Sequence, residues 1–341
     1  MKIAQIAPLI ESVPPNAYGG TERVVSYLTE ALVGLGHDVT LYASGDSVTS
    51  AHLVAVVERG LRLDPRRPDW LTWTTQMIDQ VFESAPRFDL LHFHIDYLHF
   101  PLARRCKTPS VSTLHGRQDL PDLGPLYRHF REQPVVSISD SQREPLPDAN
   151  WCATVHHGLP VDLYRFHPTP GDYFAFLGRL SPEKRVDRAI QIAIGCGVPL
   201  RIAAKVDPAD RDYFETVVRP LLAHPLIDYI GELEEKDKND FIGGARALLF
   251  PIDWPEPFGL VMIEALACGT PVISYAGGSV PEVLEHGVTG YIVNDHQQAV
   301  AAARRIDLID RRRCRQAFEQ RFTATTMAER YLEVYRALIR H

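Results

Sequence analysis

The chain has 341 residues, of which 45% are hydrophobic and 23% are charged, and its formal net charge is −7. This length exceeds what one hydrophobic core usually serves and favours two domains, while the composition excludes a disordered, collagen-like or disulfide-scaffold chain. The negative charge argues against a basic surface for nucleic acid, so we expect no nucleic acid partner.

The cysteines and the first residues indicate a reducing compartment. The five cysteines are an odd number, widely spaced, with no CxxC pair and no zinc-type spacing, which predicts free, mostly buried thiols. Residues Met1–Pro8 lack the apolar region and cleavage site of a signal peptide, and no apolar run approaches the ~20 residues that span a bilayer. We therefore expect a cytoplasmic protein whose association with the inner membrane face is at most peripheral.

The first half of the chain alternates short apolar segments with helix-like stretches, which is typical of parallel sheets covered by helices. The first helix is predicted from Thr21 to Leu35, because Thr21 is a capping residue and Gly36 follows the last apolar position. The predicted strands are 3–7, 38–43, 90–93, 110–114 and 134–138. The fold class is α/β.

A second strand–helix series begins after 165–172, where two prolines and a glycine interrupt any regular pattern. Its predicted strands are 173–177, 200–203, 227–229, 247–250 and 271–274, and its predicted helices are 186–196, 211–222, 236–245 and 260–268. Apolar residues at helical spacing predict a closing helix over 325–339. We therefore divide the chain into domains 1–167 and 168–322 and a C-terminal segment 323–341.

The densest group of reactive residues surrounds the start of the predicted helix 260–268. The backbone amides of Phe258, Gly259 and Leu260 have no partner inside that helix and are available to an electronegative ligand. Glu256 before the helix and Glu264 within it offer two carboxylates to a polyhydroxylated ligand. The alternative is that Glu256 only favours the helix N-terminus through its charge and that Glu264 is a solvated helical residue.

Two basic residues follow the first strand of the second half. Gly178 allows the chain to turn, and Arg179 and Lys184 lie on opposite sides of the helix-starting segment Ser181–Glu183. A diphosphate leaving group gains negative charge as its bond to a sugar breaks, and two fixed cations stabilise that charge without magnesium. The alternative interpretation is an ordinary basic helix entry.

Two glycine-containing turns offer backbone amides to a ligand. Gly19 and Gly20, between the first strand and the first helix, permit close backbone contact with a phosphate or an acceptor, but they do not complete a GxGxxG fingerprint. A plain tight turn remains the alternative. The segment Gly277–Val283 follows a predicted strand and lies beside the Glu256 group.

Polar residues also follow strands of the first half. His115 comes just past the end of a predicted strand, where open α/β sheets bind ligands, and is a candidate to face a reacting sugar. His92 and His94 resemble a metal pair, but without a complementary acidic pattern we predict hydrogen bonding and no bound metal. Ser139 and Arg143 follow a further strand, and a surface arginine is the alternative for Arg143.

These segments together resemble family 4 glycosyltransferases of the GT-B fold over essentially the whole chain. The specific features are Glu256 and Glu264 combined with the segment Gly178–Lys184. The resemblance implies two Rossmann-like domains with parallel sheets facing across a cleft, an acceptor domain followed by a donor domain, and a C-terminal helix that crosses back to the first domain. It also implies a retaining, metal-independent hexosyltransferase with no cofactor and no enzymic nucleophile.

The resemblance further implies a role for each candidate in the second domain. Arg179 and Lys184 would bind the donor diphosphate, and Glu264 would bind the nucleotide ribose. Glu256 and the amides of 258–260 would bind sugar hydroxyls.

In the first domain, the resemblance implies that Gly20, beside Gly19, approaches the phosphate and that His115 lies beside the donor sugar. We expect Leu53–Pro68 and Gly116–Arg131 to face the acceptor, and these are the segments about which the resemblance says least.

The identities of the donor and the acceptor follow less directly from the sequence. Similarity of Pro14–Glu22 and His94–Tyr97 to bacterial polysaccharide-assembly members favours UDP-glucose, with GDP-mannose as the alternative. The acceptor is a free sugar, a lipid-linked glycan or a small metabolite. Because the scaffold also serves other reactions, a nucleotide-sugar epimerase and a non-catalytic nucleotide-sugar binding protein stay open as alternatives.

Overall fold

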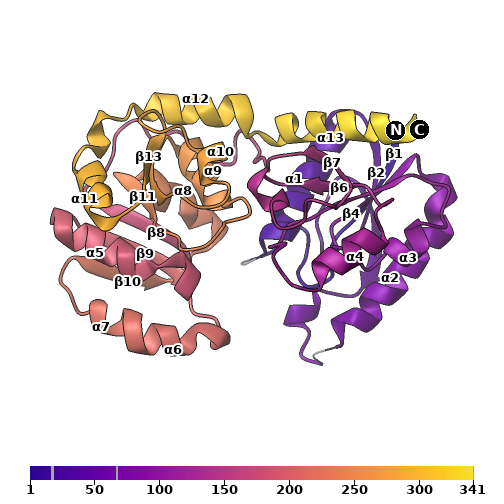
Figure 1. The fold of residues 1–341 in the computed structure, drawn as a ribbon, viewed down its shortest axis with the longest axis horizontal. Helices are drawn as coiled ribbons and strands as arrows, with labels where there is room; N and C mark the ends of the chain where they lie inside the picture. The colour runs from indigo at the N-terminus through magenta and orange to yellow at the C-terminus, as the bar shows by residue number, and fades with distance from the viewer. Residues whose placement is uncertain (17–18, 67, 341) are drawn as a thin grey trace. The chain divides into compact units, whose positions relative to one another are not determined.

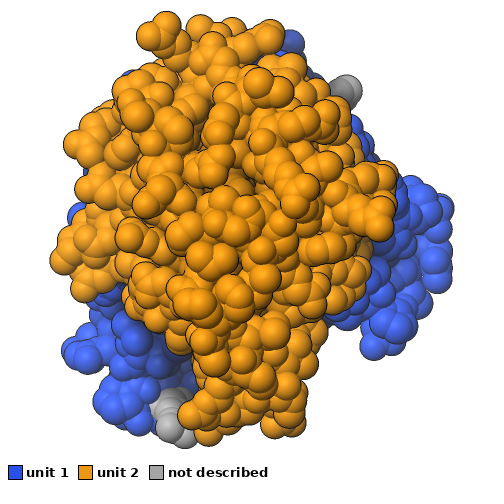
Figure 2. Space-filling model, turned by 90° about the vertical axis from the view of Figure 1, so that its left-hand side faces the viewer, with its two compact units in different colours: residues 1–160, 323–341 blue, residues 161–322 orange. Residues whose placement is uncertain are grey.

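The computed structural model describes residues 1–16, 19–66 and 68–340 (Figure 1). It divides into two compact units, which Figure 2 shows in different colours: unit 1 contains residues 1–160 and 323–341, and unit 2 contains residues 161–322. The division follows Pro160 and so comes earlier than the predicted boundary at 167. The reason is that the intervening residues bond within unit 2, where the amide of His167 donates to the carbonyl of Cys268 at 2.9 Å.

Unit 1 is built on a parallel sheet that has seven strands among the described residues, in the order β3-β2-β1-β4-β5-β6-β7. The strands are β1 (Lys2–Ile6), β2 (Asp38–Ser44), β3 (His52–Val57), β4 (Leu90–Phe93), β5 (Ser110–Thr113), β6 (Val135–Ser137) and β7 (Trp151–Thr154). The sequence did not predict β3 and β7, which are the two edge strands. The strand order reverses at β1, and ligands of such sheets bind beyond the carboxyl ends of the strands near this point.

The helices of unit 1 cover both faces of this sheet. They are α1 (Gly20–Gly34), α2 (Trp70–Ser84), α3 (Phe100–Ala103), α4 (Leu123–His129) and α13 (Ala324–Ile339). Because side chains alternate along a strand, Ala4 and Ile6 of β1 pack in one core cluster with Met77 of α2, whereas Gln5 points to the other face and bonds to Tyr335 of α13. The C-terminal helix therefore belongs to unit 1, where it also contacts α1.

The start of α1 differs from the prediction. Its N-cap is Gly19, which has no side chain to cap the helix, and Thr21 lies inside the helix, so the prediction that Thr21 caps it is wrong. A Cβ atom at Gly19 would lie 2.8 Å from the Cβ of Pro15, so close packing with the preceding loop sets the helix start. Ala17 and Tyr18, which precede this turn, lie outside the described residues. Gly36 follows the helix with φ +82°, in agreement with the predicted end.

Unit 2 is built on a second parallel sheet, which has six strands in the described chain in the order β10-β9-β8-β11-β12-β13. The strands are β8 (Phe174–Arg179), β9 (Leu200–Lys205), β10 (Ile227–Gly231), β11 (Ala247–Phe250), β12 (Val272–Tyr275) and β13 (Gly290–Val293). The strand order reverses between β8 and β11. The sequence predicted all of these strands except β13, and the prediction of two Rossmann-like domains is confirmed.

The helices of unit 2 largely follow the predicted pattern. They are α5 (Val186–Cys196), α6 (Arg211–Tyr213), α7 (Arg219–Leu221), α8 (Glu235–Gly243), α9 (Leu260–Cys268), α10 (Val280–Val283), α11 (His296–Arg304) and α12 (Arg311–Arg321). The predicted helix 211–222 is divided by a π-helical segment, Phe214–Val218. Pro220 lacks an amide hydrogen and cannot continue a regular α-helical ladder, which explains the change of winding.

Two further observations bear on the sequence predictions. All five cysteines lie in the described part of the chain and are free thiols, but only Cys268 and Cys314 are buried, and Cys152 is exposed. The prediction that most are buried is therefore wrong. Among the described residues, none of the helices is long and apolar enough to cross a bilayer.

Candidate functional site

The centre of the candidate site in unit 2 is an ion pair between Lys184 and Glu256. Lys184 follows β8 and Glu256 follows β11, and the Nζ atom of the lysine contacts Oε2 of the glutamate. The same oxygen accepts a hydrogen bond from Nε1 of Trp254 at 2.9 Å. The lysine nitrogen lies 5.3 Å from the ring centre of Phe250 and 5.1 Å from that of Trp254. The loop after β8 thus contributes the positive charge of the pair, and the loop after β11 contributes the negative charge.

This ion pair is largely removed from water, since only 16% of the Lys184 side chain and 10% of the Glu256 side chain are exposed. The cost of desolvating two charges often cancels the attraction between them, so a pair of this kind is weak support for stability. Its position at the carboxyl edge of the sheet instead favours a role in binding a charged or hydroxylated ligand.

Arg179 lies at the end of β8 and is surrounded by carboxylates. Its Nη2 atom donates to Oε1 of Glu183 at 2.9 Å, and Nη1 lies 3.5 Å from Oδ2 of Asp207. The side chain is 30% exposed. These carboxylates compete with any anionic ligand for the guanidinium group. Arg179 and Lys184 therefore lie in the same loop region but contact different carboxylates: Glu183 and Asp207 for the arginine, and Glu256 for the lysine.

Glu264 is buried in α9, so the alternative of a solvated helical glutamate is wrong. Its Oε1 atom lies 3.6 Å from Nζ of Lys238, a residue of α8 that belongs to none of the sequence motifs. That ammonium group lies 2.8 Å from Oε2 of Glu235. A buried carboxylate that a single lysine approaches at this distance keeps capacity to accept hydrogen bonds from hydroxyl groups.

The turn between Glu256 and α9 is held by the loop that follows β12. Gly259 adopts the left-handed conformation at φ +77° and is the N-cap of α9, with no side chain capping the helix. The Ser279 hydroxyl donates to the carbonyl of Phe258 at 2.7 Å, and the Ser279 amide donates to the carbonyl of Glu256 at 2.9 Å. At Gly278 a Cβ atom would lie 2.2 Å from that Glu256 carbonyl oxygen. The predicted proximity of these two loops is confirmed.

The side chain of Phe258 does not face a ligand. It is buried, and its ring packs against Phe322 with the ring centres 6.3 Å apart. Only the backbone of Phe258 is available for the predicted contact. The N-terminal end of α9, where Leu260 begins the helix, carries the partial positive charge of the helix dipole.

A cavity of about 360 Å³ lies next to this turn within unit 2. Its walls come from the last residue of β12, from segments that follow β11, β12 and β13, and from one residue of α5. The lining residues are Arg188, Ile252, Asp253, Trp254, Pro255, Tyr275, Ala276, Gly277, Gly278 and Asn294. The guanidinium of Arg188 donates to Asp253 at 3.1 Å and stacks on Tyr275 at 4.9 Å. Sequence reasoning missed Arg188, Trp254, Tyr275 and Asn294, because no motif contains them.

In unit 1, the candidate His115 lies beyond β5 and is partly exposed. Its Nε2 atom lies 2.8 Å from Nδ1 of His94, which follows β4, and its ring stacks on His157 at 5.3 Å. Burial lowers the pKa of His115 to about 3, so the ring is neutral at neutral pH. Gly19 and Gly20 form the start of α1 at the neighbouring end of β1.

His92, His94 and Arg143 have structural partners. His92 is hydrogen bonded at both ring nitrogens, to Tyr335 at 2.6 Å and Thr113 at 2.7 Å, and His94 is bonded at both of its nitrogens, as predicted. Within 1–16, 19–66 and 68–340, no group of three or more metal-binding side chains is arranged to hold an ion. Arg143 donates to the Ser137 hydroxyl at 2.7 Å and stacks on Trp151, so it supports β6 and β7.

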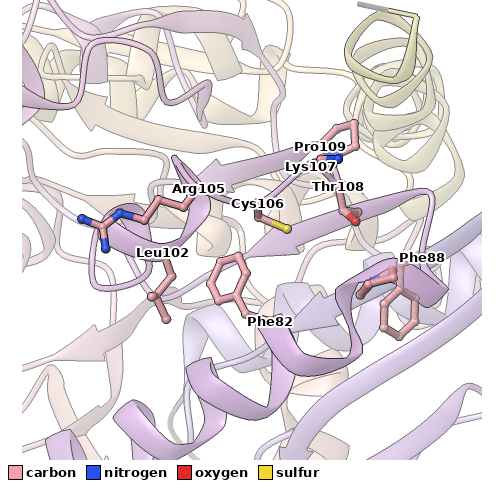
Figure 3. Close-up of a pocket in the computed structure, with 9 residues that line it drawn as sticks. Phe82, Phe88, Leu102, Arg105, Cys106, Lys107, Thr108 and Pro109 are labelled. Atoms are coloured by element: carbon pink, nitrogen blue, oxygen red, sulfur yellow. The ribbon is translucent and has the colours of Figure 1, made fainter.

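A further cavity, of about 640 Å³, lies in unit 1 (Figure 3). Its lining includes Phe88 and Pro109, which lead into β4 and β5, so it lies at the amino-terminal edge of the sheet. Parallel α/β sheets bind their ligands at the opposite edge. We therefore do not include this cavity in the candidate site.

Comparison with known families matches both halves of the chain. Residues 165–323 match the model of the glycosyl transferases group 1, and residues 18–146 match the model of glycosyltransferase family 4. The first range contains Arg179, Lys184, Glu256 and Glu264, and the second contains Gly19, Gly20 and His115. The chain is a family 4 glycosyltransferase. The glycosyltransferase thus belongs to the family that its motifs resemble.

Individual relatives agree with this assignment. The glycosyltransferase is 27% identical to glycogen synthase from Mycobacterium tuberculosis, over 95% of this chain and 93% of that protein. Sucrose-phosphate synthase from Thermosynechococcus elongatus is 18% identical with a TM-score of 0.81, over 100% of this chain and 99% of that one. The Anabaena protein HepE, solved with UDP-glucose, is 16% identical with a TM-score of 0.75, over 99% and 100% of the chains. These structures establish the GT-B fold.

Proposed function

We propose that this glycosyltransferase moves a hexose from a nucleotide diphosphate sugar to an acceptor hydroxyl with retention of the anomeric configuration. The observation that carries the proposal is the shielded Lys184–Glu256 pair at the carboxyl edge of the unit 2 sheet, beside the start of α9. A cation and a carboxylate in contact match the two parts of such a donor, an anionic diphosphate and a polyhydroxylated sugar. Polysaccharide or glycoconjugate biosynthesis is the expected setting.

The residues of unit 2 divide the donor between them in this proposal. Arg179 and Lys184 bind the diphosphate, and Glu256 accepts hydrogen bonds from sugar hydroxyls once the lysine turns to the phosphate. Glu264 binds the nucleotide ribose, and the backbone at Phe258, Gly259 and Leu260 binds sugar hydroxyls at the start of α9. In unit 1, Gly19 and Gly20 are proposed to bind phosphate, and His115 the donor sugar.

The proposed chemical step needs no enzymic nucleophile. The bond between the anomeric carbon and the diphosphate oxygen breaks, and the acceptor oxygen forms the new bond on the same face of the sugar. The acceptor proton moves to the departing phosphate oxygen. Fixed cations stabilise the negative charge that grows on this phosphate, and they act more strongly in a site shielded from water.

UDP-glucose is the favoured donor. HepE, which shares the fold, has been solved with UDP-glucose, and this resemblance supports the proposal. GDP-mannose is the alternative, because its sugar differs chiefly in the orientation of one hydroxyl. The acceptor remains a sugar, a lipid-linked glycan or a small molecule.

A thermal-shift comparison of UDP, GDP and ADP, each with its common sugars, tests the donor. A cognate ligand at 100 times its dissociation constant stabilises a protein by about 2.7 kcal/mol. We expect UDP and UDP-glucose to raise the melting temperature more than the other ligands. Stabilisation by GDP and GDP-mannose instead would select the mannosyltransferase. Interconversion of the sugar without acceptor would indicate an epimerase, and binding without any turnover would indicate a binding protein.

Transfer is also expected to continue in EDTA. The leaving phosphate meets the side chains of Arg179 and Lys184, which carry their charge without a bound ion. Initial rates measured after dialysis against EDTA should match untreated enzyme within about twofold. Loss of turnover that magnesium or manganese restores would contradict the metal-independent step.

A further inference from the structure

A chain of buried hydrogen bonds in unit 1 ends at His115. The Gln5 side chain of β1 donates from Nε2 to the Tyr335 hydroxyl of α13 at 3.1 Å. Its Oε1 atom lies 2.8 Å from Nε2 of His94, and Nδ1 of His94 lies 2.8 Å from Nε2 of His115. Gln5, His94 and Tyr335 are buried, and the proposed transfer mechanism does not use them.

The chemistry of the Gln5 amide determines which ring nitrogens of His94 and His115 carry hydrogens. The carbonyl oxygen of Gln5 can only accept, so Nε2 of His94 carries a hydrogen. Burial holds the pKa of His94 well below its ordinary value, so the ring is neutral and its Nδ1 atom is an acceptor. His115 must therefore donate from Nε2, and because it is neutral as well, its Nδ1 atom carries a lone pair.

Tyr335 fixes the orientation of the Gln5 amide. Its hydroxyl accepts from Gln5 and lies 2.6 Å from Nδ1 of His92, to which it donates its single hydrogen. Nε2 of His92 then donates to the Thr113 hydroxyl at 2.7 Å. A flip of the amide would require the tyrosine hydrogen and the His92 tautomer to change together. Burial raises the pKa of Tyr335 well above its ordinary value, so the hydroxyl keeps its hydrogen.

This series of hydrogen bonds ends at the Nδ1 atom of His115. In the described part of the structure this atom is shielded from water and has no hydrogen-bond partner. A shielded acceptor without a partner costs free energy, which a ligand that supplies a donor would recover. His115 is partly exposed as a residue, so the buried network of hydrogen bonds ends near the surface of unit 1.

We propose that Tyr335, Gln5 and His94 are positioning residues that hold His115 in the Nε2–H tautomer, so that Nδ1 accepts a hydrogen bond from a hydroxyl of the donor sugar. The inference rests on the proposed function for the identity of that ligand. It assigns the C-terminal helix a part in the site, since α13 supplies the hydroxyl that orients the amide. With a reversed amide both histidine tautomers would change, and His115 would present an N–H group at Nδ1, which repels the same hydroxyl hydrogen.

Nitrogen-15 NMR of histidine-labelled protein tests the tautomer without any ligand. The His115 ring, assigned by the loss of its signals in His115→Asn, should show a protonated Nε2 and an unprotonated Nδ1 between pH 6 and pH 8, a range set well above its pKa of about 3. Protonated Nδ1 in the wild-type protein would overturn the proposal. The measurement is independent of turnover, so it separates failure of this inference from failure of the proposed function.

A matched pair of variants tests the role of the hydroxyl. Tyr335→Phe removes the hydroxyl group that orients Gln5. Tyr331→Phe removes another buried hydroxyl of the same helix. This second hydroxyl bonds Thr113 at 2.8 Å, and Thr113 is separated from Gln5 by His92 and Tyr335. Tyr335→Phe should shift His115 toward a mixture of tautomers and lower kcat/KM for the nucleotide sugar about tenfold, the loss expected for one hydrogen bond. Tyr331→Phe should leave the His115 spectrum unchanged and kcat/KM within about twofold.

Equal effects of the two substitutions on kcat/KM, with equal losses of melting temperature, would show a structural role alone and would overturn the proposal. Gln5→Met provides an independent variant, since it removes both amide contacts while keeping the length of the side chain. It should produce the same tautomer mixture as Tyr335→Phe. An unchanged His115 tautomer in Gln5→Met would also contradict the inference.

Discussion

Replacement of Lys184 by alanine is expected to lower kcat/KM for sugar transfer about 10²–10³-fold, the loss seen when one preorganised group that stabilises transition-state charge is removed. The ammonium group lies in contact with Glu256 and near the rings of Phe250 and Trp254, where little water screens it. A cation in such surroundings stabilises a departing phosphate much more than an exposed lysine does. Steady-state kinetics with the donor identified by thermal shift measures the effect.

The same substitution should also destabilise the protein, because it leaves the carboxylate of Glu256 shielded without its cation. The Trp254 hydrogen bond at 2.9 Å remains, so we expect a cost of about 3 kcal/mol, the lower end of the range for breaking a buried ion pair, and a folded variant. Circular dichroism and urea unfolding check this point. Activity is therefore compared well below the unfolding transition of the variant.

Lys236→Ala is the matched control within the same unit. Lys236 pairs with Glu234 at 2.7 Å, but its side chain is 73% exposed, and such pairs contribute little. Its removal should leave kcat/KM and stability nearly unchanged. Transfer by Lys184→Ala at the rate of this control would refute the assignment of the leaving-group cation.

The sheets were largely predictable from the sequence. Central strands such as β4 and β11 are buried on both faces, and their continuous apolar runs identify them. The edge strands β3, β7 and β13 were missed, whereas the edge strand β10 was predicted. β7, Trp151–Thr154, for example, is short and half-buried and lacks such a run. The predicted cap of α1 was wrong because the close fit of Gly19 against Pro15 determines the helix start. The local sequence pattern does not contain this contact.

The sequence predicted which strand each site residue follows, but it did not predict which side chains contact one another. The sequence placed Lys184 and Glu256 after β8 and β11, which are neighbours in the sheet. Their contact joins residues 72 positions apart and depends on how two loops fold over the sheet edge. Trp254, which donates a hydrogen bond to Glu256, and Lys238, which lies near Glu264, belong to no motif. The proximity of His94 and His115 follows from the adjacency of β4 and β5, so strand order could have predicted it.

Replacement of Glu256 by glutamine is expected to lower turnover strongly with little loss of stability. Glu256→Gln preserves the shape of the side chain, and the amide oxygen can still accept from Nε1 of Trp254. It removes the negative charge that faces Lys184 and the second acceptor oxygen for sugar hydroxyls. We therefore expect kcat to fall about a hundredfold, measured with saturating donor, while the melting temperature changes by only a few degrees.

Glu256 also precedes α9, and if it acted only through the helix dipole the substitution would cost about 0.3–1 kcal/mol of stability and leave turnover intact. Glu234→Gln distinguishes the two roles, because Glu234 is the N-cap residue of α8 in the same unit and its side chain is 71% exposed. This control should reproduce the small change in stability with normal kinetics. If Glu256→Gln behaves like Glu234→Gln in both measurements, the carboxylate does not bind the donor sugar, and its contact with Lys184 serves the fold alone.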